Sequence, residues 1–175
     1  MIETARLLIR PWTEADRAPF AAMSADPEVM QHLGPLLDRA ASDVIVGRLM
    51  AMQQVVGYGF WALEDRASGA FIGFCGLKPA PLGIPGLTGF PEIGWRLARH
   101  AWGQGLASEA AQAVIDWGWG QGMTRIVAMT VPANTRSEAV MRRIGMRRRP
   151  DLDFDHPQLL PGDPLRPHIA TEILR

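Results

Sequence analysis

Apolar and polar residues alternate at the start of the chain, as they do in a half-buried strand. In the segment 6–11 (R-L-L-I-R-P), Leu7 and Ile9 fall on one face and the proline ends the pattern. Thr13 follows, with Asp16 three residues later, which is an imperfect form of the capping box that begins helices. The sequence therefore predicts a first strand followed by a helix.

Two further helices are predicted before the middle of the chain. Asp26-Pro27 is a typical helix start, because aspartate caps free amides and proline fits the first helical position. Further on, Ser42 or Asp43 is expected to cap a longer helix, whose apolar residues recur at helical spacing up to Met52.

A hairpin is predicted next. The β-prone runs 60–64 and 70–77 are separated by the polar segment 65–69 (D-R-A-S-G), whose composition is typical of a turn. The chain's single cysteine, Cys75, lies in the second run. A lone thiol excludes an internal disulfide, and we expect Cys75 to be a small buried side chain.

The segment 79–91 is rich in proline and glycine but carries four large apolar residues. A long loop in a small domain is often functional, yet apolar residues in a connection also cover the core or a partner chain. The pattern leaves both interpretations open. The four apolar residues are Leu82, Ile84, Leu87 and Phe90.

The segment 91–111 (P-E-I-G-W-R-L-A-R-H-A-W-G-Q-G-L-A-S-E-A-A) changes from a β-prone run to a glycine turn and then to an alanine-rich helix. Glycines let a backbone approach a ligand closely, and the free N–H groups of a helix start attract anions. A phosphate group is the natural occupant of such a turn. The helix, 107–119, is expected to face inward through Ala110, Ala111, Val114, Ile115 and Gly118.

A second connection from strand to helix follows the first. The run 125–131 (R-I-V-A-M-T-V) predicts a strand, 132–134 a turn and 135–144 a short helix that ends at Gly145.

Composition narrows the function classes. The 175 residues contain 18 basic and 18 acidic side chains, so the net charge is zero, which disfavours a dedicated nucleic-acid binder. No segment has the length of a membrane span, and the N-terminus lacks a signal-peptide pattern. We expect a single domain over residues 1–175, in the cytoplasm and without membrane or nucleic-acid partners.

Three ordered motifs resemble the GNAT superfamily of N-acetyltransferases, in the branch of the ribosomal-protein N-terminal (alanine/serine) acetyltransferases. The segments 3–11 and 25–30 look like that branch's first strand and helix. The segments 92–110 and 134–137 look like its acetyl-CoA motif and the helix that follows it. The resemblance covers nearly the whole chain. It implies an α/β (α+β) fold with one mixed, mostly antiparallel sheet of six to seven strands, flanked by about four helices.

The resemblance also implies how acetyl-CoA, the expected cosubstrate, is bound. Backbone amides of the glycine turn would hold the pyrophosphate, with a hydroxyl from Ser108, and Asn134 would contact the pantetheine arm or an ordered water. The arm would pair with the strand before the turn, by β-augmentation. The implied residues of the turn are Gly103, Gln104, Gly105, Leu106 and Ala107, and those of the strand are Trp95, Arg96 and Leu97.

Glu92 is the candidate base. Acetyl transfer needs a neutral amine, so a group must take its proton, and strand alternation places Glu92 on one face with Gly94 and Arg96. The alternative is a structural carboxylate paired with a nearby arginine. The family's usual proton-donating tyrosine aligns with Met141, which cannot donate, so Ser137, water or another residue would assist the leaving thiolate.

Other polar residues give weaker indications. The four histidines are scattered without ligand spacing, so no metal site is expected. The run 147–149 (R-R-R) could meet a phosphate or an acidic substrate, or be solvated, and the acids of 151–155 could attract an amine or form an exposed turn. Tyr58 is expected to pack at a bend.

The sequence thus predicts acetyl-CoA-dependent N-acetylation of a primary amine by direct attack in a ternary complex. A non-catalytic acetyl-CoA sensor is the alternative, because Trp102, where the family usually has arginine or glutamine at the head of the turn, and Met141 depart from the family's pattern. The acceptor, either a protein N-terminal α-amine or a small amine, stays open, as does a homodimer.

Overall fold

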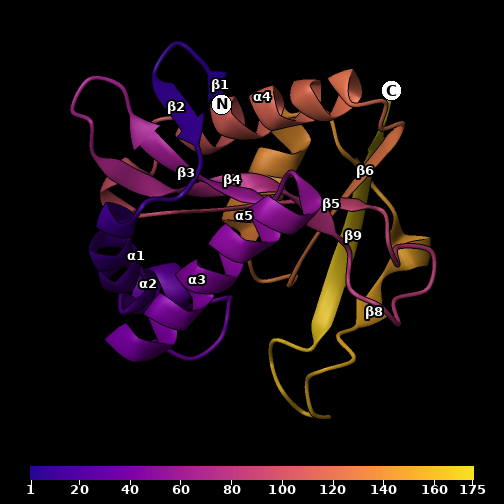
Figure 1. The fold of residues 1–175 in the computed structure, drawn as a ribbon. Coiled ribbons are helices and arrows are strands. Elements are labelled where there is room, and N and C mark those ends of the chain that lie inside the picture. Colours follow the sequence, from indigo (N-terminus) through magenta and orange to yellow (C-terminus); the bar gives the residue numbers. More distant parts are fainter.

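A mixed sheet of nine strands, in the order β1-β2-β3-β4-β5-β6-β9-β7 with β8 beside β9, forms the centre of the molecule (Figure 1). The computed structural model describes residues 1–175. The strands are β1 (Ile2–Glu3), β2 (Leu7–Arg10), β3 (Phe60–Asp65), β4 (Phe71–Pro79), β5 (Pro91–Leu97), β6 (Arg125–Thr130), β7 (Arg147–Arg148), β8 (Phe154–Asp155) and β9 (Pro167–Leu174). The sheet has more strands than predicted because β1, β7 and β8 are two-residue strands, too short to leave a periodic pattern.

Five α-helices cover the sheet, one more than expected. They are α1 (Arg17–Ser24), α2 (Pro27–Met30), α3 (Arg39–Val56), α4 (Leu106–Gly120) and α5 (Thr135–Arg143). Three 3₁₀ turns occupy Glu14–Asp16, Arg99–Ala101 and Pro150–Leu152.

The predicted helix starts are confirmed in two cases and corrected in one. The capping box of Thr13 and Asp16 is present, and the Asp26 side chain caps α2. The long helix begins earlier than predicted: Asp38 is its cap, and Ser42 lies buried inside it. Residues 39–41 (R-A-A) carry no large apolar side chain, so the hydrophobic period starts only after the helix has begun.

Helices pack on both faces of the sheet. On one face, α4 lies over β4 and β5 with the five predicted residues buried, from Ala110 to Gly118. On the other, α1 and α3 enclose an aromatic cluster around Phe20 and Phe74. The predicted hairpin is confirmed as the antiparallel pair β3–β4, and Cys75 within it is fully buried.

The loop between β4 and β5 covers the core. Ile84 and Leu87 are 0% exposed and pack with Val127 of β6 and Ala170 of β9. Of the two interpretations left open for residues 79–91, the structure supports the core-covering one for these side chains.

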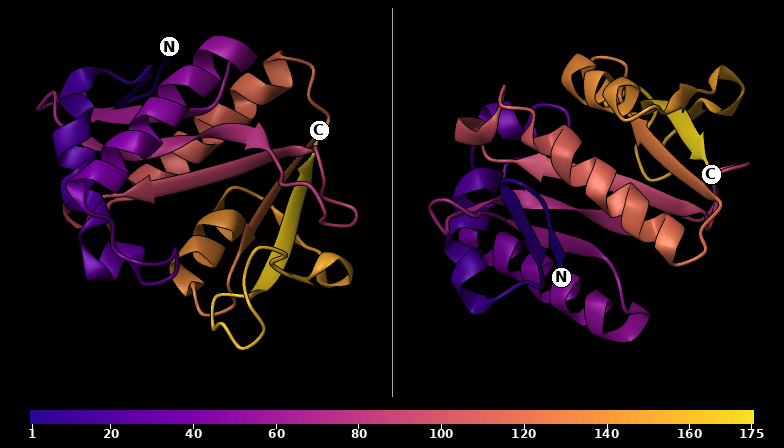
Figure 2. Two further views of the ribbon diagram at one scale, coloured as in Figure 1. Left: turned by 60° about the horizontal axis from the view of Figure 1, so that its bottom comes forward. Right: turned by 90° about the horizontal axis from the view of Figure 1, so that it is seen from above.

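Every neighbouring strand pair is antiparallel except β5 and β6, which run parallel. These two strands share only one registered pair, Glu92 with Val127. Beyond that pair they diverge, and Figure 2 (left) shows the C-terminal part of the chain, β6, α5 and β9, turning away from β5. The sheet is therefore open between β5 and β6.

Candidate active site

The edge of β5 that faces this opening has free backbone groups. At the two ends of the β4–β5 pairing, Ala98 N donates to Ile72 O at 2.9 Å and Ala80 N to Phe90 O at 2.8 Å. Antiparallel partners exchange hydrogen bonds in every second pair, so the even-numbered residues of β5 bond to β4. The odd-numbered residues Trp95 and Leu97 direct their N–H and C=O groups towards β6.

This alternation separates the three strand residues expected to contact the pantetheine arm. The backbone of Trp95 faces the opening, whereas the backbone of Arg96 is used in the pairing with β4. The Leu97 carbonyl already accepts a 2.8 Å hydrogen bond from Trp102 Nε1. The Trp102 ring in turn lies 4.5 Å from the Arg136 guanidinium of α5, which joins the turn to the far side of the opening.

The glycine turn presents an uncapped helix start. Gly103 and Gly105 have φ of 76° and 78°, and Gly105, the N-cap of α4, offers no side chain to the first amides of the helix. Ser108 Oγ, in the first turn, is buried without a hydrogen-bond partner. Free amides and an unpartnered hydroxyl at the start of a long helix fit an anionic phosphate group.

The segment between β1 and β2 also holds the turn. Arg6 Nη1 donates to the Gln104 carbonyl at 2.8 Å, and Arg6 Nη2 lies 2.6 Å from Glu109 Oε2 of α4. Burial acts to raise the pKa of Glu109, but hydrogen bonds from Thr4 and Arg6 outweigh it and hold that pKa below its ordinary value. Leu106 is buried in the core and Ala107 packs against it, so both can offer only backbone groups.

A cavity of about 380 Å³ lies between β5 and β6 and is lined by residues of both strands, of α5 and of the segment 30–37. Its charged lining residues are Lys78, Glu92 and Arg96. Glu92 and Lys78 form an ion pair, with the Glu92 side chain 13% exposed. Gly94, between the two charged residues of β5, leaves room for the Phe60 ring, because an added Cβ would approach that ring to 3.0 Å.

The alternative interpretation of Glu92 was a structural carboxylate paired with a nearby arginine. The structure does give Glu92 a basic partner, but that partner is a lysine. Lys78 stands opposite Glu92 in the register of β4 and β5. An ionised carboxylate is acceptor-only, and a lysine partner takes up part of its acceptor capacity. Glu92 still lines the cavity, so both the pairing and the role of a base remain compatible with its position.

Three residues of α5 or its cap line the same cavity: Asn134, Ser137 and Met141. Asn134 caps the helix through its Oδ1, which accepts from Ser137 N at 3.2 Å. Ser137 and Met141 are four residues apart and so share a face of the helix. The structure brings Glu92, Asn134 and Ser137 together around one space, and Ser108 lies in the first turn of α4.

The structure also gives contacts for the other polar residues that the sequence singled out. Arg148 pairs with Asp153, and Arg149 pairs with Asp151 and Glu172, so these two arginines and their acids are not free for a ligand. Arg147 is exposed and forms no ion pair. Tyr58 packs against Trp117, with ring centroids 5.9 Å apart, as expected for a residue at a bend.

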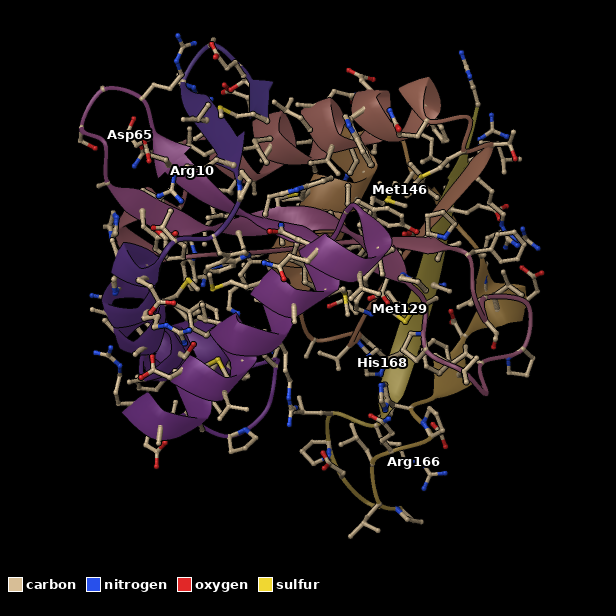
Figure 3. The ribbon with its side chains drawn as sticks, viewed as in Figure 1. Arg10, Asp65, Met129, Met146, Arg166 and His168 are labelled. Carbon is tan, nitrogen blue, oxygen red and sulfur yellow. The ribbon has the colours of Figure 1, made fainter.

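Two histidines that are distant in sequence meet in the structure. His156 and His168 have ring centroids 5.2 Å apart, and Phe154 stacks on His168 at 5.3 Å. Figure 3 shows His168 on β9 below Met129, near Arg166. Burial lowers the pKa of both imidazoles, and the neighbouring ring lowers that of His156 further. No spacing pattern indicates this contact, because pairing of β8 with β9 creates it.

The profile of the acetyltransferase (GNAT) domain family matches residues 6–147. The chain belongs to the GNAT family. A relative from Bacillus subtilis, the uncharacterized protein YkkB, is 32% identical over 145 residues, which are 82% of this chain and 83% of that protein.

Solved GNAT structures have the same fold. An acetyltransferase of the GNAT family from Bacillus anthracis superimposes with a TM-score of 0.81 at 25% identity, covering 99% of this chain and 97% of that one. RimL, a ribosomal-protein alpha-N-acetyltransferase solved with coenzyme A, gives a TM-score of 0.77 at 18% identity, covering 98% of this chain and 95% of that one. At that identity the likeness shows a shared fold.

GNAT enzymes are N-acetyltransferases that use acetyl-CoA, and this chain has features that fit the coenzyme. The open edge of β5, the uncapped start of α4 and the unpartnered Ser108 hydroxyl are places for an extended polar arm and a phosphate. None of the helices combines the length and apolar character that crossing a membrane requires.

Proposed function

We propose that this GNAT protein transfers the acetyl group of acetyl-CoA to a primary amine by direct attack in a ternary complex. The observation that carries the proposal is the cavity between the diverging strands β5 and β6, because it contains Glu92 beside an open strand edge. Such a space can hold an acyl donor against β5 while an amine approaches Glu92.

Each part of the site has a role in this proposal. Backbone amides from Gly103 to Ala107 and the Ser108 hydroxyl bind the pyrophosphate, and the Trp95 backbone pairs with the pantetheine arm, with Asn134 beside it. The thioester of acetyl-CoA supplies the acetyl carbon. A strand amide pointing at its carbonyl would stabilise the developing oxyanion.

Glu92 takes the proton of the amine, directly or through a water, as the nitrogen forms its bond to the acetyl carbon and the carbon–sulfur bond breaks. The leaving thiolate can receive a proton from Ser137 or from water, because Met141 on the same helix face has none to give.

Direct attack is favoured over an acyl-enzyme route. Cys75 is the chain's one thiol, it is 0% exposed, and burial raises its pKa well above the ordinary value. A buried, protonated thiol is a poor nucleophile. The structure offers no other cysteine for a covalent intermediate.

Thiol release from acetyl-CoA tests the proposal with a panel of amino acids, small amines and peptides with free N-termini. We expect release that depends on one acceptor class and saturates with both substrates, with the acetylated product found by mass spectrometry. Calorimetric binding of acetyl-CoA without turnover on any acceptor would instead indicate a sensor, and an acetylated Cys75 would overturn direct attack.

A further inference from the structure

Arg96 is a partly buried cation without an acidic partner. Its side chain reaches the cavity wall, its Nε is buried without a hydrogen-bond partner, and no carboxylate lies within ion-pair distance. Glu92, on the same strand face, is already paired with Lys78, and Glu28 is paired with Arg99.

The contacts that Arg96 does make are weak ones for a guanidinium. Nη1 lies 3.3 Å from Ser24 Oγ and 3.0 Å from the Met30 sulfur, which is a poor acceptor. The charged group also lies over the rings of Phe20 and Phe74, at 5.2 and 5.0 Å from their centroids. Cation–π contacts hold the guanidinium in place but leave its planar fork of donors available.

This arrangement is costly unless a ligand completes it. Burial lowers the pKa of Arg96 to about 10, which reflects the lost solvation of its charge. Taking an unpaired charge out of water is unfavourable, and most buried charges have a counter-ion. Among the lining residues, the charges of Lys78 and Glu92 offset each other. The cavity therefore keeps one net positive charge, at Arg96.

The position of Arg96 points to the acceptor and not to the coenzyme. Its side chain lies on the sheet face covered by α1 and α3, the same face as Glu92, whereas the glycine turn leads into α4 on the opposite face. A guanidinium matches a carboxylate with two parallel hydrogen bonds. The rest of this wall is apolar, with Met30, Leu37 and Ile45 among its members.

We propose that Arg96 binds the carboxylate of the acceptor, and that the acceptor is a small amine carrying a carboxylate and an apolar body, such as an apolar amino acid. The inference rests on the proposed acetyl transfer and narrows its acceptor class. It favours a free amino acid over a protein N-terminus, in which the α-carboxylate is lost to the peptide bond.

Leucine and leucinamide test it as a matched pair in the thiol-release assay. The amide's amine is the less protonated one near neutral pH, so intrinsic reactivity favours the amide. We expect the opposite order with this protein, with kcat/KM for leucine roughly 10- to 100-fold higher, as expected for a hydrogen-bonded charge pair. Equal kcat/KM for the two, or preference for the amide, would overturn the inference.

Variants test whether Arg96 is responsible for the preference for leucine. Arg96→Met should lower kcat/KM for leucine by about 10- to 100-fold and change that for leucinamide by less than about threefold, with Arg96→Lys between. Arg48→Met, at an exposed position of α3, is the control and should change neither. If Arg96→Met lowers kcat/KM equally for leucine and leucinamide while acetyl-CoA still binds, Arg96 has only a structural role.

A binding measurement keeps the inference testable without variants or turnover. Calorimetry of the wild-type protein with coenzyme A should show N-acetylleucine binding at least about tenfold tighter than N-acetylleucinamide. Equal affinities would refute a carboxylate subsite. Turnover of amines without selectivity for a carboxylate would refute this inference alone, whereas failure to bind acetyl-CoA would refute the proposed function itself.

Discussion

At the residue scale, the site depends on which charges have partners. Glu92 has Lys78, Arg6 has Glu109, and Arg96 has no acid. A paired carboxylate at the edge of a cavity can hold an ammonium group or accept its proton. Substitution of Glu92 distinguishes these two roles, because they respond differently to pH.

The variant Glu92→Gln keeps the shape of the side chain and removes its basicity. If Glu92 is the base, kcat near neutral pH should fall by about 100-fold or more, while the affinity for acetyl-CoA stays the same. The loss should shrink as pH rises, because the free amine is then available without a base. Steady-state kinetics from pH 6 to about 10 measure this.

Glu28→Gln is the matched control, because Glu28 also pairs with a basic residue, Arg99, but lies outside the cavity. Glu28→Gln should leave the dependence of kcat on pH unchanged. Full turnover of Glu92→Gln across the pH range would leave Glu92 with a structural role only.

Ser108→Ala should separate binding from stability. The hydroxyl has no partner in the protein, so its loss should leave the free energy of unfolding unchanged or slightly higher, since alanine favours helices. If Ser108 donates to the pyrophosphate, coenzyme A should bind about tenfold more weakly. Calorimetry and thermal unfolding on the same samples measure both, and unchanged affinity would exclude the contact.

At the scale of elements, the start of α4 is shaped by backbone conformation. Gly105 caps the helix with φ of 78°, a conformation that costs other residues about 1–2 kcal/mol. Its position leaves the first amides of the helix without a side-chain cap, which is unfavourable for the helix but suits an anion. The start of α4 therefore leaves backbone amides that an anionic ligand can satisfy.

Substitutions at the two ends of α4 test this. Gly105→Ala should lower the free energy of unfolding by about 1–2 kcal/mol and weaken acetyl-CoA binding, because the residue resists a positive φ. An added Cβ there would lie 3.7 Å from Arg6 Nη2, an ordinary contact, so the cost comes from the backbone.

Gly120→Ala, at the other end of the helix, is the control. Its Cβ would meet open space, and Gly120 has no positive φ, so this variant should be neutral or up to about 1 kcal/mol more stable. Chemical denaturation compares the two. Equal effects at both ends would mean that the positive φ at position 105 costs alanine nothing.

At the scale of the whole molecule, ion pairs connect β9 to β6 and hold the C-terminal segment together. Glu172 of β9 pairs with Arg125 and Arg149, and Asp153 pairs with Arg148. Nearby, His156 and His168 pack against each other, and burial lowers the pKa of both. Figure 3 shows Arg10 at the opposite side of the molecule, where it holds Asp16 through two 2.8 Å hydrogen bonds.

Stability should fall as the pH drops from about 7 to 5. Burial lowers the pKa of His156 and His168 in the folded protein, so the unfolded chain, with ordinary histidine pKa values near 6.5, takes up protons first. Protonation then favours unfolding through this window. The carboxylates with lowered pKa, such as Asp16, act only at lower pH.

Thermal unfolding of His168→Gln tests this, because the variant should flatten the pH dependence between 5 and about 7. His32→Gln, outside the pair, should retain it. A wild-type protein whose stability is constant over this range would contradict the predicted direction.

Local patterns in the sequence predicted most of the elements and the glycine turn. Helix and strand periodicity depends on neighbours within about four residues, as does capping by Thr13 or Asp26, so these features can be read without the fold. The start of α3 was missed because its first residues lack an apolar period. The two-residue strands were missed because register with a neighbour defines them, not composition.

The sequence by itself determined the family resemblance, the glycine turn before α4, and the positions of Glu92, Ser108 and Asn134 along the chain. The tertiary structure decided which of these side chains have partners: Lys78 stands beside Glu92, the histidines meet, and Arg96 has no acid. The physical reason is the separation along the sequence over which each kind of interaction acts. Periodicity and capping act over a few residues, whereas the partner of a charge depends on strand register and on segments brought together from distant parts of the chain.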